Sequence, residues 1–139
     1  SIVDSVLRRI RGAVEYPNYG VVESPDGLTR ISARVVVVTA RETAQAVPGV
    51  RVALSKRIIS SVGEGDYSLG GYSDEVDGTE VTAGMAGRST AVEITLAADY
   101  GLDLRRLGER VRAEVSARIR TLTDLEPVQV TVIIDDVFG

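Results

Sequence analysis

The stretch from Ala91 to Ile134 constrains the fold most strongly, because it reads as a strand, a helix and a second strand in direct succession. Apolar and polar residues alternate from Ala91 to Asp99 and again from Val128 to Ile134, which is typical of strands with one buried face. Such faces need a covering layer, so the stretch predicts a sheet with helices on one side. The residues expected on the buried faces are Val92, Ile94, Leu96 and Ala98, then Val128, Val130, Val132 and Ile134.

An amphipathic helix is predicted between these two strands. Asp103 is the expected N-cap, because its carboxylate can accept a hydrogen bond from a backbone N–H of the first turn. Pro127 prevents the helix from continuing. Gly108 lies in the apolar stripe at a cost of about 1 kcal/mol in helix propensity, so we expect it to allow a close approach to the sheet. The stripe contains Leu104, Leu107, Val111, Val115, Ile119 and Leu122.

Upstream of this stretch, the segment from Ile31 to Val47 is ambiguous. Four consecutive valines from Val35 favour a strand, whereas the spacing of apolar residues fits a helix. Ser32 stands where an N-cap is expected and Pro48 stands where a helix should stop. We therefore favour the helix. Short strands are expected at Gly20–Glu23, Leu28–Ile31, Val50–Leu54 and Thr79–Gly84, with a tight connection at Met85–Ser89.

Residues 1–28 are expected to form an amphipathic helix followed by a turn-rich lead-in. The helix has three alternative roles: it packs on its own domain, it docks on a neighbouring subunit or partner protein, or it lies on an anionic membrane surface. Packing on its own domain is the favoured one. The residues that would bind a partner are Ile2, Val6, Leu7, Arg8, Arg9, Ile10 and Arg11.

The composition narrows the possible chemistry. The 139 residues include no Cys, which excludes disulfides, thiol catalysis and cysteine-bound zinc, and no His, which removes the commonest general base near neutral pH. We expect no catalytic residues, no cofactor and no metal. No apolar run reaches the ~20 residues of a membrane-spanning helix and no signal peptide is evident, so we expect a cytoplasmic protein, with association at the inner face of the cell membrane as a further possibility.

Charge is distributed unevenly along the chain. Residues 1–60 hold nine basic and five acidic residues, whereas residues 61–100 hold one basic and eight acidic residues. This polarity either steers subunits head to tail or is simply a solvated surface, and the second interpretation is favoured.

The acidic, glycine-rich stretch from Ser60 to Gly78 is expected to be a long loop or a hairpin excursion. Asp74–Gly78, with Glu64 and Asp66, offers oxygen ligands for calcium but lacks the spacing of an EF-hand, so a solvated loop is favoured.

Other candidate sites have simpler explanations as well. Gly84–Thr90 resembles a phosphate cradle but lacks the lysine and the following helix of a P-loop, which favours a turn. The arginines of the main helix suggest RNA binding, but intervening glutamates favour a solvated face with Glu–Arg pairs. An enzyme is the third and least favoured hypothesis. Its candidate residues would be Asp99, Tyr100, Asp103, Asp135 and Asp136.

The order of these signals resembles the alkaline shock protein family, bacterial proteins of the envelope stress response. The resemblance covers about residues 29–138 and is strongest at Asp99-Tyr-Gly-Leu-Asp-Leu104, where family members have a Tyr-Gly and then, three positions after the glycine, an isoleucine. The sequence departs from the family at Ala83-Gly84, where Lys-Gly is common. The other matching stretches are Ile31-Ser32 before a helix that ends in Val47-Pro-Gly-Val50, Gly84 with the strand at 91–98, and Leu122-Thr-Asp-Leu125 before the last strand.

The resemblance implies a small, non-enzymatic protein that self-assembles or binds a membrane-anchored relative. We therefore expect a non-catalytic structural or scaffold protein of the cell envelope stress response that forms homo-oligomers, with an RNA-binding module as the alternative. The expected fold class is α+β, in two layers: a mostly antiparallel sheet of three to five strands, two main helices on one face, and the N-terminal amphipathic helix. Residues 1–28 form the lead-in and residues 29–139 form the alkaline-shock-protein-like domain.

Overall fold

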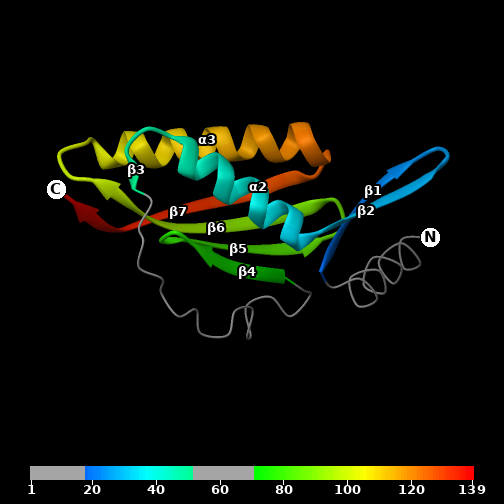
Figure 1. Ribbon diagram of the computed structural model, residues 1–139. Coiled ribbons are helices and arrows are strands. Elements are labelled where there is room, and N and C mark those ends of the chain that lie inside the picture. Colours follow the sequence, from blue (N-terminus) through cyan, green and yellow to red (C-terminus); the bar gives the residue numbers. More distant parts are fainter. Residues whose placement is uncertain (1–17, 52–70) are drawn as a thin grey trace.

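A computed structural model describes residues 18–51 and 71–139 and has two layers, a five-stranded sheet and two helices that cover one of its faces (Figure 1). All strand pairs in this sheet are antiparallel except one. The predicted α+β, two-layer architecture is therefore confirmed. The N-terminal amphipathic helix expected within residues 1–28 lies outside the described residues.

A separate hairpin precedes the two-layer body. Strands β1 (Tyr19–Ser24) and β2 (Gly27–Ser32) pair antiparallel and extend away from the sheet (Figure 1). The N–H of Val21 donates to the carbonyl of Gly87 at 2.8 Å, which fixes the hairpin to the turn at one end of the sheet. Both short strands expected in this region are confirmed. The hairpin crosses the boundary expected between residues 28 and 29.

The ambiguous segment is a helix, α2 (Ala33–Ala46). The hydroxyl of Ser32 accepts a hydrogen bond from the N–H of Val35 at 3.4 Å, as expected of an N-cap. After the helix, Gly49 has a φ of +100°, which a glycine adopts without strain and which turns the chain into β3. The buried face of the helix consists mainly of small residues: Ala33, Val36, Val37, Ala40 and Ala44.

The sheet is built around its longest internal strand, β6. One edge of β6 pairs with β5, and past the end of that pairing the same edge pairs with the short β3. The other edge of β6 pairs with β7. β6 and β7 run parallel because helix α3 crosses over the sheet between them. The elements are β3 (Val50–Arg51), β4 (Gly71–Val76), β5 (Thr79–Ala86), β6 (Ser89–Asp99), α3 (Leu104–Thr123) and β7 (Glu126–Phe138).

Of the two forms expected for Ser60–Gly78, a long loop or a hairpin excursion, the structure shows a hairpin at the C-terminal end of the segment. Gly71–Val76 is strand β4, which pairs with β5 through a tight turn at Asp77-Gly78, and both turn residues have a positive φ. The glycines and acids suggested a loop, but pairing with a complete neighbouring strand outweighs this weak local preference. Residues 60–70 lie outside the described chain, as do residues 52–54 of the strand expected at Val50–Leu54.

The core lies between the helices and the sheet. Asp103 caps α3, accepting from the N–H of Arg106 at 3.2 Å, and most of the predicted stripe is buried. Leu122 is 61% exposed, so the prediction that it belongs to the buried stripe was wrong. The helix ends one residue later, and the left-handed conformation of Asp124 turns Leu125 into the core instead. The fully buried residues of α3 are Val111, Val115 and Ile119.

Gly108 is buried, but the reason predicted for it was wrong. A methyl group added there would meet no heavy atom within 4 Å outside its own helix. The glycine therefore leaves unfilled space beside α3 and does not permit a close approach to the sheet.

Two register shifts interrupt β7. Pro127 pairs with Thr90 but Gln129 pairs with Ala91, so Val128 is an extra residue and is 62% exposed. Val128 was predicted to share a face with Val130, but a bulge reverses the alternation of side chains at this point. The second shift makes Asp135 the extra residue.

Candidate interaction surface

The arginines of α3 are mostly held by nearby acceptors. Three of them form ion pairs within the helix or with its N-cap, a fourth pairs with Glu126 on β7, and Arg112 donates to the carbonyl of Val130 at 3.1 Å. This arrangement matches the Glu–Arg pairing favoured by the sequence. The ion pairs are Arg105–Glu109 at 2.8 Å, Arg106–Asp103 at 3.7 Å, Arg110–Glu114 at 2.7 Å and Arg120–Glu126 at 2.9 Å.

The pair at the start of β7 is bidentate. Both carboxylate oxygens of Glu126 accept from the guanidinium of Arg120, at 2.9 and 3.3 Å. This hydrogen bonding lowers the pKa of Glu126 below its ordinary value and raises the pKa of Arg120. Both side chains are about half exposed, so the pair orients the end of α3 against β7 without adding much stability.

The acidic residues of the β4–β5 hairpin do not converge on one point. Asp74 forms an ion pair with Arg41 of α2 at 3.1 Å, whereas its neighbour Glu75 lies on the opposite face of the sheet. Within residues 18–51 and 71–139, no group of three acidic side chains is placed to hold a metal ion. Glu64 and Asp66, also considered for calcium, lie outside these ranges.

The connection from Gly84 to Thr90 is a hairpin turn with an internal bond. The buried hydroxyl of Thr90 donates to the carbonyl of Gly84 at 2.9 Å. A hydroxyl used in this way is not directed at a phosphate, so the turn favoured by the sequence accounts for the stretch.

The contacts of three of the four carboxylates considered for catalysis are local. Asp103 caps α3, Asp99 pairs with Arg51 at 3.3 Å, and Asp136 accepts from the N–H of Val137 at 2.9 Å. They lie at strand and helix ends, with no shared partner among these contacts.

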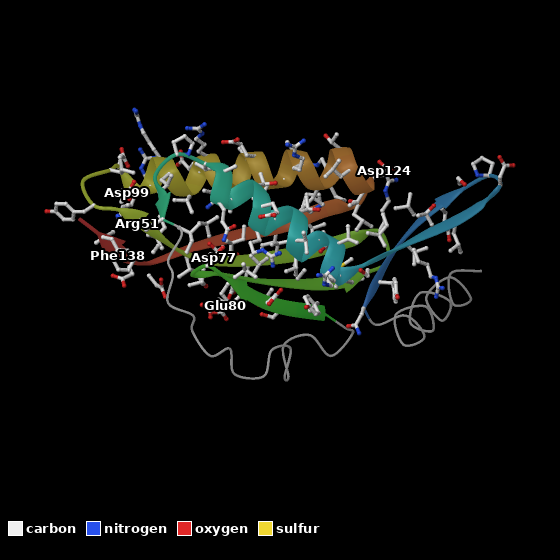
Figure 2. The ribbon with its side chains drawn as sticks, in the orientation of Figure 1. Arg51, Asp77, Glu80, Asp99, Asp124 and Phe138 are labelled. Carbon is white, nitrogen blue, oxygen red and sulfur yellow. The ribbon has the colours of Figure 1, made fainter. Side chains whose placement is uncertain are left out.

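One end of the sheet gathers exposed aromatic and apolar side chains, a feature that the sequence did not predict. Tyr100 is 75% exposed, and its N–H donates to the carbonyl of Phe138 at 2.8 Å. Arg51 lies over the ring of Phe138, 5.4 Å from its centroid, and also pairs with Asp99 (Figure 2). We name this cluster the aromatic end: Arg51, Tyr100, Leu102, Val137 and Phe138.

The second exposed feature is the outer side of β7, which we name the β7 edge. In the part of the chain that the structure describes, β7 pairs only with β6, although it is the longest strand. Val128 and Ile133, which is 38% exposed, place apolar surface along it. Strands with a free edge of this kind readily pair with another chain.

The residues predicted from sequence to bind a partner lie outside the described residues. Ile2, Val6, Leu7, Arg8, Arg9, Ile10 and Arg11 all precede the first described residue. Neither described helix is both long and apolar enough to cross a membrane.

Comparison with known proteins gives one match. The sequence model of the alkaline shock proteins, a family with a cell envelope-related function, matches residues 21–138, which is most of the chain. No curated protein and no solved structure matches. The matched range begins inside β1 and includes the rest of the hairpin, both helices and the described sheet. The chain therefore belongs to the alkaline shock protein family, whose function is related to the cell envelope.

Proposed function

We propose that this protein is a non-catalytic structural or scaffold protein of the cell envelope stress response. It self-associates or binds a membrane-anchored relative, and through such a partner it resides at the inner face of the cell membrane. The observation that carries this proposal is the pair of exposed apolar surfaces, the aromatic end and the β7 edge, on a domain of an envelope-related family. Exposed apolar patches on a small domain indicate contact with other proteins.

The polar groups support a role in presenting surfaces. The acidic candidates for catalysis serve as a helix cap, an ion-pair partner and a strand-end acceptor. These contacts use the carboxylates to hold the fold, and they do not bring two of the carboxylates to one shared group.

Light scattering coupled to size-exclusion chromatography tests the self-association. The protomer mass is 14.8 kDa, and we expect the measured mass to rise above it with protein concentration. A mass of one protomer at every concentration and salt level would remove this part of the proposal. Replacing Tyr100 with Ser tests the aromatic end in the same experiment, with Thr121→Ser on the exposed face of α3 as the control.

The envelope partner is tested by capture from native lysate. We expect the full chain to retain a membrane-anchored protein, identified by mass spectrometry. A chain lacking residues 1–14 shows whether the N-terminal segment, with Ile2, Val6 and Leu7, is needed.

RNA binding stays the alternative function, and filter binding at low salt tests it. Most arginines of α3 already have acidic partners, which reduces the attraction of this helix for phosphates. We therefore expect no retention of RNA. Retention that weakens with added salt would favour the alternative.

A further inference from the structure

The regular middle of the β7 edge is suited to pairing with another strand. Between the two bulges, Gln129–Ile134 contains no charged residue, no Gly and no Pro, and five of its six residues are β-branched valine, threonine or isoleucine. Segments of this composition have high strand propensity. Free edges of natural sheets are usually protected by charges or prolines, and here both lie outside the segment, at Pro127 and Asp135-Asp136.

The hydrogen bond from Arg112 shows which backbone groups face outward. Its guanidinium reaches the carbonyl of Val130 at 3.1 Å, and it can do so only from the outer side of β7 because β6 occupies the other side. The backbone groups of alternate residues point to the same side of a strand. The outward groups of the segment therefore belong to Val130, Val132 and Ile134.

We propose that the β7 edge pairs antiparallel with the β7 edge of a second copy of this chain, about a two-fold axis at Val132. This inference rests on the self-association proposed above and names its surface. The pairing sets Val132 opposite itself and Val130 opposite Ile134 of the second copy. Outward-facing groups thus meet outward-facing groups, as an antiparallel ladder requires. The two sheets become one continuous sheet, with the helices of both copies on the same side.

Charge selects this register. Pairing centred nearer the C-terminus would bring the Asp135-Asp136 sequences of the two copies together, and like charges facing each other across strands are destabilising. Centring at Val132 instead places Asp136 opposite Val128 of the second copy. Arg112 contacts the carbonyl of Val130, which is two positions from Val128. In the pair, Arg112 therefore lies beside the Asp135-Asp136 sequence of the second copy.

Arg112 therefore has two roles. In the single chain it occupies one outward carbonyl and partly protects the edge. In the pair it provides a cation for the carboxylates of the second copy, so added salt weakens the association.

Single cysteines test the register directly, because the natural chain has none. In the proposed pair, the two Cα atoms at position 132 are about 5.5 Å apart, within the range of a disulfide. We expect Val132→Cys to form a disulfide-linked dimer under mild oxidation. Val128→Cys is the matched control: it lies on the same strand and is more exposed, but its two copies are eight positions apart, about 27 Å at about 3.4 Å per residue.

A mixture of two variants gives a second measurement that avoids the half-buried position 132. Thr131→Cys and Ile133→Cys face each other only in the proposed register. We expect the mixed dimer to form at least tenfold faster than either variant alone.

The outcomes separate this inference from the proposed function. Cross-linking at position 132 and in the mixture, with little at position 128, supports the register. Oligomers seen by light scattering without these cross-links, or with equal cross-linking at position 128, overturn the β7 pairing alone. A wild-type chain that stays monomeric overturns the pairing and the proposed self-association together.

Discussion

Two strands on opposite edges of the sheet, β4 and β7, are protected to different degrees. In each case the helix above donates a side chain to the strand: Gln45 of α2 to the carbonyl of Val76 at 2.9 Å, and Arg112 of α3 to the carbonyl of Val130 at 3.1 Å. β4 has six residues and two carboxylates, and one of these, on Asp74, is paired with α2. β7 has thirteen residues and a six-residue uncharged middle.

The difference shows how one sheet can have a closed edge and an open one. A single donor from a helix covers one carbonyl, which is a large share of a short strand and a small share of a long one. We infer that β4 ends the sheet, whereas β7 is available for contact with another chain.

The largest expected effect comes from opening the protected edge. Arg41→Leu removes the partner of Asp74 from a largely buried position, which should lower the free energy of unfolding by about 1–3 kcal/mol. Urea denaturation measures this change. Arg34→Leu, on the exposed face of the same helix, should change the stability by less than about 0.5 kcal/mol. Equal losses for the two variants would mean that the Arg41–Asp74 pair does not secure β4.

The next effect concerns association. Ile133→Lys places a charge on the open edge and should weaken self-association at least tenfold, or about 1.4 kcal/mol by the usual conversion. Ser73→Lys places the same charge on the same face of β4 and should leave association unchanged. Analytical ultracentrifugation of both variants compares the two edges. A greater effect of Ser73→Lys would reverse the assignment of open and closed edges.

A smaller effect, on the free energy of unfolding, is expected from a substitution in α3. Gly108→Ala improves helix propensity and fills open space beside α3, which should raise the free energy of unfolding by about 1 kcal/mol. Thermal denaturation measures the gain, and self-association should stay at the wild-type level because the β7 edge is untouched. A loss of stability would show that the space beside Gly108 is needed by the fold.

The smallest effect depends on pH at the first residue of β7. Because the folded-state pKa of Glu126 is lowered by Arg120, its contribution to stability is present above the unfolded pKa and is lost as the pH falls through the lower folded value. Carbon NMR of the carboxyl group should show the pKa return toward its ordinary value in Arg120→Ala. An unchanged titration would mean that the pair does not form in solution.

Local signals were enough to predict most of the fold. Ser32 and Pro48 marked the ends of α2 although its valines favour a strand, because capping and termination depend on neighbouring residues. Asp103 marked the start of α3 in the same way. Alternation predicted β6, whose inward residues Val92, Ile94 and Leu96 are all buried.

The features that define the candidate surface depend on distant contacts. The bulge at Val128 inserts one residue opposite β6 and reverses the face of the residues around it, which periodicity alone does not reveal. Arg112 and Val130 are eighteen positions apart, and Phe138 meets Arg51 only in the folded chain. The aromatic end and the β7 edge therefore required the structure.

Amide hydrogen exchange, followed residue by residue at low and high protein concentration, tests the difference between the two edges most directly. The account predicts that the outward amides of Val132 and Ile134 exchange more slowly as the concentration rises, while the outward amides of β4 exchange at a constant rate. Exchange at β7 that does not depend on concentration, in a protein that is oligomeric by mass, would contradict it.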